Sequence, residues 1–225
     1  MQPSDLRRAG AQLGVPLDED QMERLIRYVG LLQQWNARFN LISRRDVGRI
    51  WSRHVLDSLS IAPLLRLNGD GQSTPDEKLT AVDIGSGAGF PGIPLAIADP
   101  HIEWHLIDRN QRKVRFLETV IAVLGLENAA AYSLDLGAEA PRHLLGRADI
   151  AVSRAVDDPA GLVPLAEPLL GAGSRMILMT GASGTGPTDR RLPDECTHRV
   201  SAVHDLIIPG LDRTHEVTII ERVRT

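Results

Sequence analysis

The first sixty or so residues carry the spacing of amphipathic helices. The sequence Pro16-Leu17-Asp18-Glu19-Asp20 has a proline and acidic residues where a helix begins. After it, apolar residues recur mostly three or four positions apart, at Met22, Leu25, Ile26, Val29, Leu32 and Phe39. A second helical stretch is expected over Val47–Leu65. No strand pattern appears here, so we expect an N-terminal helical extension over residues 1–67.

The pattern changes after residues 68–78, a segment rich in Gly, Ser, Pro, Asp and Asn that predicts a linker loop. Short apolar runs then alternate with helical stretches, which is typical of a parallel sheet covered by helices on both faces. The expected strands are Leu79–Ile84, Glu103–Asp108, Ala129–Leu134, Asp149–Ser153 and Met176–Thr180, and the expected helices are Pro91–Ala98, Asn110–Leu124 and Asp157–Leu170. Two more strands, Arg199–Ile208 and His215–Val223, have no helix between them and predict an antiparallel hairpin. Residues 79–225 are therefore expected to form one α/β domain.

Composition narrows the class of protein. Hydrophobic residues make up 43% and charged residues 24% of the 225 positions, as in ordinary globular proteins. A net charge of −4 argues against non-specific coating of nucleic acid, although 25 Lys and Arg could still form a local basic face. The single cysteine, Cys196, excludes an internal disulfide and a cysteine-based metal cluster, and we expect no metal. With no run of 18 apolar residues and no signal-peptide core in Met1–Gly14, we expect a cytoplasmic protein without membrane contact.

A glycine-rich loop follows the first predicted strand, with the sequence Gly85-Ser86-Gly87-Ala88-Gly89. Gly85 lets the chain turn sharply, while Gly87 and Gly89 let backbone approach a ligand. Residues 87–92 also match the G-x-G-x-x-G pattern of dinucleotide sites. However, Asp83 stands where dinucleotide sites usually have an apolar residue, and a carboxylate there can hold the loop backbone beside a cationic sulfonium. The loop therefore favours S-adenosylmethionine over NAD as cofactor.

Three more candidate residues or short segments follow predicted strands, where ligands bind in such sheets. Asp108 could accept the ribose hydroxyls of either cofactor, or instead cap the following helix. Asp135-Leu136-Gly137 would lie near an adenine, although Asp and Gly at a strand end are also ordinary turn residues. Arg154 stands where enzymes that methylate exocyclic amines carry an N/D-P-P-Y/F motif, which is absent. An arginine cannot act as a base, so we expect Arg154 to position a carboxylate, a phosphate or an acceptor atom with a free lone pair.

Positive charge gathers at two places in the sequence. One group lies between Trp35 and His54 and the other follows Asp108; their members are Arg38, Arg44, Arg45, Arg49 and Arg53, and Arg109, Arg112, Lys113 and Arg115. We expect RNA contact from these groups, including the adjacent His54, whereas solvated helix faces are the alternative. His54 and Asp57 could pair on one helix face and close the N-terminal helices over the cofactor.

Taken together, these stretches resemble the RsmG (GidB) family of small-subunit ribosomal RNA guanine-N7 methyltransferases. The likeness runs from about Leu25 to Ala155 and rests on R-H-x-L-D-S at Arg53–Ser58, on G-x-G-x-G-F-P-G-I-P-L at Gly85–Leu95, and on Ser153-Arg154-Ala155. It implies the class I S-adenosylmethionine-dependent methyltransferase fold, with a Rossmann-like, mostly parallel seven-stranded sheet. It also implies a cytoplasmic bacterial enzyme that methylates guanine N7 in 16S rRNA, with naked rRNA or an assembling small subunit as partner. Cofactor contacts are implied at Gly85, Phe90, Leu136, Gly137 and Arg154, and we expect a monomer.

One departure keeps alternatives open. Family members usually have a lysine before the glycine that ends the fifth strand, where this chain has Thr180-Gly181. A paralogous methyltransferase of the same fold, acting on another RNA, a protein or a small molecule, is therefore the alternative. Two alternatives come from other classes of protein: an NAD-dependent oxidoreductase and a non-catalytic nucleotide-binding module.

Overall fold

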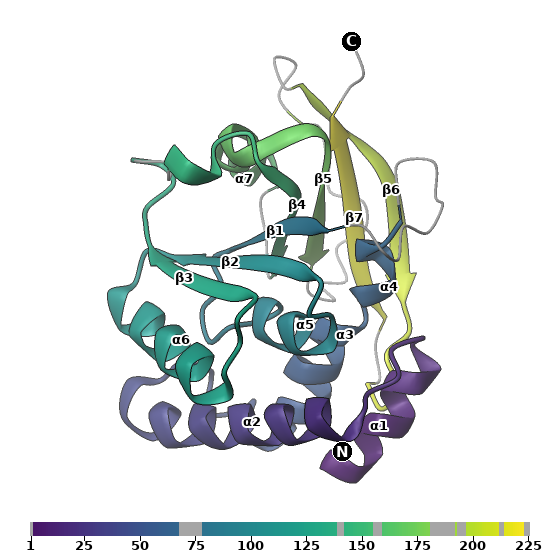
Figure 1. The fold of residues 1–225 in the computed structure, drawn as a ribbon. Helices are drawn as coiled ribbons and strands as arrows, with labels where there is room; N and C mark the ends of the chain where they lie inside the picture. Colours follow the sequence, from purple (N-terminus) through teal and green to yellow (C-terminus); the bar gives the residue numbers. More distant parts are fainter. Residues whose placement is uncertain are drawn as a thin grey trace.

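The computed structural model describes residues 2–67, 78–138, 142–154, 159–180, 192, 197–211 and 214–222. Seven strands form one sheet in the order β3-β2-β1-β4-β5-β7-β6 (Figure 1). The strands are β1 Leu79–Ile84, β2 Ile102–Asp108, β3 Ala129–Ser133, β4 Ala148–Arg154, β5 Leu170–Thr180, β6 His198–Leu206 and β7 His215–Arg222. The first five pair in parallel, whereas β7 runs antiparallel to both β5 and β6. The predicted parallel sheet with an antiparallel hairpin is confirmed.

The helices around the sheet are α1 Pro3–Gln12, α2 Glu19–Phe39, α3 Asp57–Leu59, α4 Ala62–Leu65, α5 Gly92–Ala98, α6 Gln111–Leu124 and α7 Pro159–Ala166. Helix α2 begins where the acidic residues predicted, because the carboxylate of Asp18 accepts from the Gln21 N–H at 2.8 Å. It ends at Phe39, and the next residue, Asn40, adopts the left-handed conformation that closes many helices.

The helical stretch predicted over Val47–Leu65 is helical in the structure, but it is divided into several short elements. The chain there forms a 3-10 turn η1 (Val47–Arg49), a π-helix η2 (Trp51–Leu56) and the short helices α3 and α4. The Ser58 hydroxyl donates to the His54 carbonyl and the Ser60 hydroxyl to the Asp57 carbonyl, both at 2.6 Å. Such side-chain bonds compete with regular helical hydrogen bonding.

The helix predicted to reach Leu170 is also too long. Helix α7 stops at Ala166, the 3-10 turn η4 (Glu167–Leu169) contains Pro168, and β5 already begins at Leu170. Proline lacks the N–H that a continuing helix needs.

Side chains of the sheet alternate between two apolar cores. Ala81 and Trp104 face the core that contains α1, α2, α3, α5 and α6. Val82 and Ile107 face the other core, which contains α7 and the 3-10 turn η3 (Arg142–Leu144). In Figure 1, α5 and α6 lie against the sheet and α2 lies on their far side. The N-terminal helices thus share a continuous core with the sheet, whereas the division of the chain at residues 68–78 stays a prediction. Across the described ranges, no helix has the length and apolar character needed to cross a membrane.

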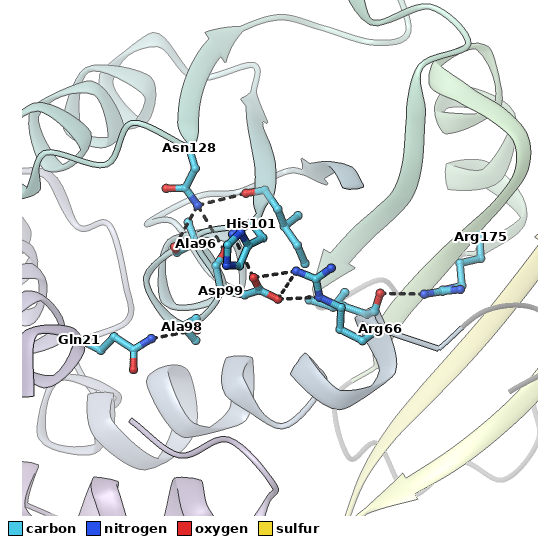
Figure 2. Close-up of polar contacts among 10 residues, drawn as sticks. Gln21, Arg66, Ala96, Ala98, Asp99, His101, Asn128 and Arg175 are labelled. Carbon is cyan, nitrogen blue, oxygen red and sulfur yellow. Dashed lines mark hydrogen bonds and ion pairs between the residues drawn. The ribbon is translucent and has the colours of Figure 1, made fainter. Parts of the chain in front are cut away.

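A polar network fixes the N-terminal helices at the edge where β2 begins (Figure 2). Arg66, which follows α4, binds Asp99 through two bonds, Nε to Oδ2 at 2.7 Å and Nη2 to Oδ1 at 2.8 Å. Gln21 of α2 donates to the Ala98 carbonyl at 3.0 Å, and Arg175 of β5 donates to the Leu65 carbonyl at 2.8 Å. This network lies away from the strand ends that carry the candidate site, so it holds the helices without occupying that site.

Candidate functional site

The glycine loop lies at the edge of the sheet where β1, β2, β3 and β4 end, which we call the carboxyl edge. The Gly85 and Ser86 N–H groups both donate to the Ile107 carbonyl of β2, at 2.8 and 3.0 Å. Gly85 has a φ of 75° and Gly89 a φ of 93°, in the left-handed region that favours glycine. A Cβ on Gly89 would also lie 2.6 Å from Ile93 Cγ1. The loop therefore requires glycine for its shape as well as for open space.

Asp83 organises this loop from inside the protein. Its side chain is fully buried, and its Oδ2 accepts from the Gly92 N–H at 3.0 Å, at the start of α5. A Cβ on Gly92 would lie 2.8 Å from that same oxygen, so strand and helix approach closely only because Gly92 has no side chain. Burial raises the pKa of Asp83 to about 7. The structure thus gives Asp83 the loop-holding role that the sequence suggested.

Asp108 joins the end of β2 to the same loop. Its Oδ2 accepts from the Gly87 N–H at 2.9 Å and its Oδ1 from the Asn110 N–H at 2.8 Å. Lys113 Nζ lies 3.5 Å from Oδ2, so this lysine stands beside the glycine loop. The cap of α6 is Asn110, whose side chain accepts from the Arg112 N–H. Asp108 is therefore not the helix cap, and it connects the loop to the entry of α6.

Leu136 and Gly137 lie in the turn after β3, at the same edge. The Gly137 N–H donates to Asp135 Oδ1 at 3.1 Å, in an exposed turn. Ser133 at the end of β3 pairs with Asp108 at the end of β2, so this turn follows directly beside the Asp108 loop. That register places both predicted nucleoside contacts along one edge of the sheet.

Arg154, at the end of β4, is held on several sides. Its guanidinium carbon lies 5.4 Å from the centre of the Phe90 ring, and its Nη2 contacts His54 Nδ1. The His54 ring also stacks on the Phe90 ring, and the two ring centres lie 4.8 Å apart. On a further side, Arg154 Nε lies 3.7 Å from Asp57 Oδ2. Arg154 Nη1 is buried and has no hydrogen-bond partner among the described residues.

His54 behaves here as a neutral ring. It is 7% exposed, and burial together with the Arg154 charge lowers its pKa to about 4. A neutral imidazole has an acceptor nitrogen for the guanidinium. The expected pairing of His54 with Asp57 takes a different form, because Arg154 contacts both residues.

Two residues that the sequence did not single out also contact this site. The Tyr28 hydroxyl of α2 donates to the Ala88 carbonyl in the glycine loop at 2.6 Å, and its ring meets Phe90 edge-on at 5.5 Å. His215 Nδ1, at the start of β7, lies 2.6 Å from Asp57 Oδ1. Tyr28 shares the apolar face of Leu25 and Leu32, and a buried tyrosine needs a partner for its hydroxyl, which is the signal that could have marked it.

The two basic groups converge at one end of the molecule. Helices α2 and α6 run antiparallel, since Arg27 of α2 donates to the Val123 carbonyl late in α6, and the rings of Trp35 and Phe116 lie 5.5 Å apart. The end of α2 therefore lies beside the start of α6, which follows Asp108. The exposed arginines at this end are Arg38, Arg44, Arg45, Arg49, Arg53, Arg109, Arg112 and Arg115. Arg53 is paired with Asp46 at 2.9 Å, while His54 is buried. Among the described residues, no group of His, Cys, Asp or Glu could hold a metal ion.

Comparisons with known proteins agree with this geometry. The family model for GidB, the rRNA small subunit methyltransferase G, matches residues 21–205. A ribosomal RNA small subunit methyltransferase G from Neisseria meningitidis serogroup C is 33% identical over 99% of this chain and all of the relative. The one from Ralstonia nicotianae is 35% identical over 96% of this chain and 94% of the relative.

Solved structures show the same fold at low sequence identity. A SAM-dependent methyltransferase from Aquifex aeolicus matches 67% of this chain and 85% of its own, with a TM-score of 0.51 and 15% identity. A mutant of MtNAS in complex with S-adenosylmethionine matches 99% of this chain and 78% of its own, with a TM-score of 0.55 and 16% identity. The fold is that of a class I S-adenosylmethionine-dependent methyltransferase, and the chain belongs to the GidB family of rRNA small subunit methyltransferases G.

Proposed function

We propose that this protein transfers a methyl group from S-adenosylmethionine to N7 of a guanine in 16S ribosomal RNA. The observation that carries the proposal is the glycine loop, which is held between Asp83 and Asp108 and faced by Arg154 in a chain of this family. The family relatives are rRNA methyltransferases by name, and the choice of guanine N7 rests on the resemblance and on the chemistry below.

The residues at the carboxyl edge fit S-adenosylmethionine. Asp108 Oδ2 already accepts from the Gly87 N–H and from Lys113 Nζ, whereas Oδ1 accepts only from the Asn110 N–H. A carboxylate oxygen can accept two bonds, so Oδ1 has capacity for a ribose hydroxyl, and Oδ2 gains the same capacity when Lys113 turns away. The buried Nη1 of Arg154 has no partner among the described residues, and it would be satisfied by the carboxylate of the cofactor. Leu136 and Gly137 would line the adenine side. When bound, S-adenosylmethionine supplies an electrophilic methyl group on its sulfonium.

Guanine N7 is an acceptor that these residues can serve. It carries a lone pair in the plane of the base, so no side chain has to remove a proton before attack. Catalysis is then a matter of orientation and electrostatics. Arg154, which cannot accept a proton, and His54, which is neutral and committed to Arg154, are consistent with that requirement. Arg154 thus acts as a positioning group in this proposal.

The RNA would lie across the basic end of the molecule. Arg44, Arg45 and Arg49 on the turn after α2, and Arg109, Arg112 and Arg115 at the start of α6, are exposed beside the Asp108 loop. Contacts to phosphate by such groups position RNA without reading its sequence. Arg53 and Lys113 would contribute only after leaving Asp46 and Asp108, and the buried His54 is left out of this surface.

The test is methyl transfer by purified protein from labelled S-adenosylmethionine to naked 16S rRNA and to small subunits, with N7-methylguanosine mapped in the product. We expect label at one guanine in at least one substrate, and the same mark missing from rRNA of a strain that lacks the gene. Arg154→Ala should weaken cofactor binding about 10–100-fold, as expected for loss of a charged hydrogen bond. Arg147→Ala, at an exposed position ahead of β4, is the matched control. Unchanged rRNA methylation in the deletion strain would refute the proposal.

The alternative is a paralogue with another RNA, a protein or a small molecule as substrate. It rests on Thr180, which stands where the family usually has lysine and whose side chain lies outside the described residues. Cofactor binding that is lost with Arg154→Ala, combined with no transfer to either rRNA substrate, would favour this alternative.

A further inference from the structure

Asp57 stands between two residues that come from distant parts of the chain. Its side chain is 4% exposed, and Oδ1 lies 2.6 Å from His215 Nδ1 while Oδ2 lies 3.7 Å from Arg154 Nε. Asp57 belongs to the N-terminal helices, Arg154 ends β4 and His215 starts β7. One carboxylate therefore joins three elements at the carboxyl edge.

The sheet topology explains why His215 arrives there. Strand β7 is antiparallel to β5, with Glu216 opposite Thr180 at the end of β5. The first residue of an antiparallel strand lies at the edge where its parallel neighbours finish, so His215 lies at the same edge as Arg154, although β5 intervenes between β4 and β7 (Figure 1). Asp57 reaches both because α3 packs against α5, below this part of the sheet.

The contacts leave one edge of the guanidinium available. Nη2 is taken by His54, Nε faces Asp57, and the flat face lies over Phe90. An arginine side chain loses considerable rotamer freedom when it is fixed in one position. Where that freedom has been lost before a ligand binds, the ligand binds more tightly. A carboxylate that is itself anchored by His215 holds the guanidinium better than one free to rotate.

We propose that Asp57 and His215 are positioning residues, which keep Arg154 oriented so that its Nη1 edge meets the carboxylate of S-adenosylmethionine. This inference rests on the proposed function of Arg154. His215 acts only through Asp57 and Arg154, and touches neither cofactor nor substrate. The C-terminal hairpin thereby contributes to a site built mainly by β1, β2 and β4.

A merely structural role for this cluster gives a different pattern of effects. If Asp57 and His215 only tied the N-terminal helices to the hairpin, their loss would lower stability and leave the cofactor affinity of the folded fraction unchanged. If they position Arg154, the KM for S-adenosylmethionine should rise with kcat little changed, because a ground-state contact is lost.

The experiment compares three replacements of His215 by calorimetric S-adenosylmethionine binding and steady-state kinetics on the full chain. His215→Ala removes the ring nitrogen that lies against Asp57 Oδ1, His215→Gln moves the side-chain nitrogen one carbon further out, and His215→Asn keeps a nitrogen near the position of Nδ1. We expect Kd and KM to rise about tenfold for Ala and Gln, and to stay near wild type for Asn. His204→Ala, at an exposed position on the neighbouring strand β6, is the control and should have no effect. The Asn and Gln pair decides the question even if the Ala variant fails to fold.

A double-mutant cycle tests the route of the effect. Arg154→Lys keeps the charge but loses Nε, so His215→Ala should change the cofactor Kd far less in that background than in wild type. Asp57→Asn should resemble His215→Ala. Equal affinity for wild type and His215→Gln, or an undiminished effect in the Arg154→Lys background, would overturn the inference. Failure of the wild-type protein to bind S-adenosylmethionine would instead count against the proposed function.

Discussion

Tyr28→Phe removes one oxygen atom from the contact between the N-terminal helices and the glycine loop. The Tyr28 hydroxyl is buried and donates to the Ala88 carbonyl at 2.6 Å. Phenylalanine would keep the edge-on contact with Phe90 and the packing on Phe116, so no large cavity forms. The cost is that of a buried carbonyl left without its donor, about 1–2 kcal/mol of the free energy of unfolding.

The chain provides its own control, because Tyr132 is its other tyrosine. Tyr132 is partly buried, and its hydroxyl lies 3.2 Å from His105 Nδ1, away from the glycine loop. Tyr132→Phe should therefore lower the free energy of unfolding by less than about 1 kcal/mol. Urea unfolding of both variants measures the difference, provided that the slope m is unchanged.

Cofactor binding separates a loop effect from a general loss of stability. Because Ala88 lies inside the glycine loop, we expect Tyr28→Phe to weaken S-adenosylmethionine binding several-fold in calorimetry, and Tyr132→Phe to leave it unchanged. If both variants lose equal stability and both bind the cofactor like wild type, the Tyr28 hydroxyl does not hold the loop and this reasoning fails.

Three further outcomes are expected. Gly92→Ala should lower the free energy of unfolding by about 1–3 kcal/mol, because its Cβ would lie 2.8 Å from Asp83 Oδ2. Gly30→Ala, which has open space around it in α2, is the control and should be neutral or stabilising. Urea unfolding measures both variants. Asp83→Asn imitates the protonated acid, whose pKa of about 7 in the folded protein is raised by burial. As pH rises from about 4 to 7, wild type loses the stability that protonated Asp83 contributes. The variant should therefore gain free energy of unfolding relative to wild type over that range, by at most about 1.4 kcal/mol per pH unit. A difference in free energy of unfolding that stays constant with pH would contradict the buried, protonated state. Arg45→Ala should weaken rRNA binding and reduce the slope of log affinity against log salt by about 1, whereas Arg147→Ala should leave both unchanged; equal slopes for the two variants would argue against an RNA surface at the end of α2.

Much of the sheet and its ligand edge could be predicted from local patterns. Buried parallel strands have continuous apolar runs, and the ends of such strands meet at one edge. Asp83, Asp108 and Arg154 can be identified for that reason, because each stands at or beside a strand end. The hairpin followed from two strand patterns without a helix between them. These inferences needed only periodicity and the direction of the chain.

Contacts between distant segments could not be predicted in this way. The pairing of Asp57 with His215 depends on how α3 packs below the sheet and on where β7 enters it, which no local pattern specifies. Within the irregular helices after Val47, the hydroxyls of Ser58 and Ser60 bond to the carbonyls of His54 and Asp57, and such bonds compete with regular helical hydrogen bonding. Apolar spacing predicted a helical stretch there without its division into short elements, because periodicity does not register such competition.

The N-terminal helices are part of the cofactor site as well as part of the core. Tyr28 bonds to the glycine loop, His54 stacks on Phe90, and Asp57 faces Arg154. The loop itself lies between β1 and α5, so its shape is supported from a separate stretch of the sequence. Residues that contact ligand-binding groups in this way fix the orientation of those groups. The exposed arginines proposed to contact RNA follow the same helices. RNA binding at that surface would therefore act on the elements that hold Arg154. Cofactor affinity and RNA binding should therefore be coupled in this protein, and the coupling should run through Tyr28 and Asp57.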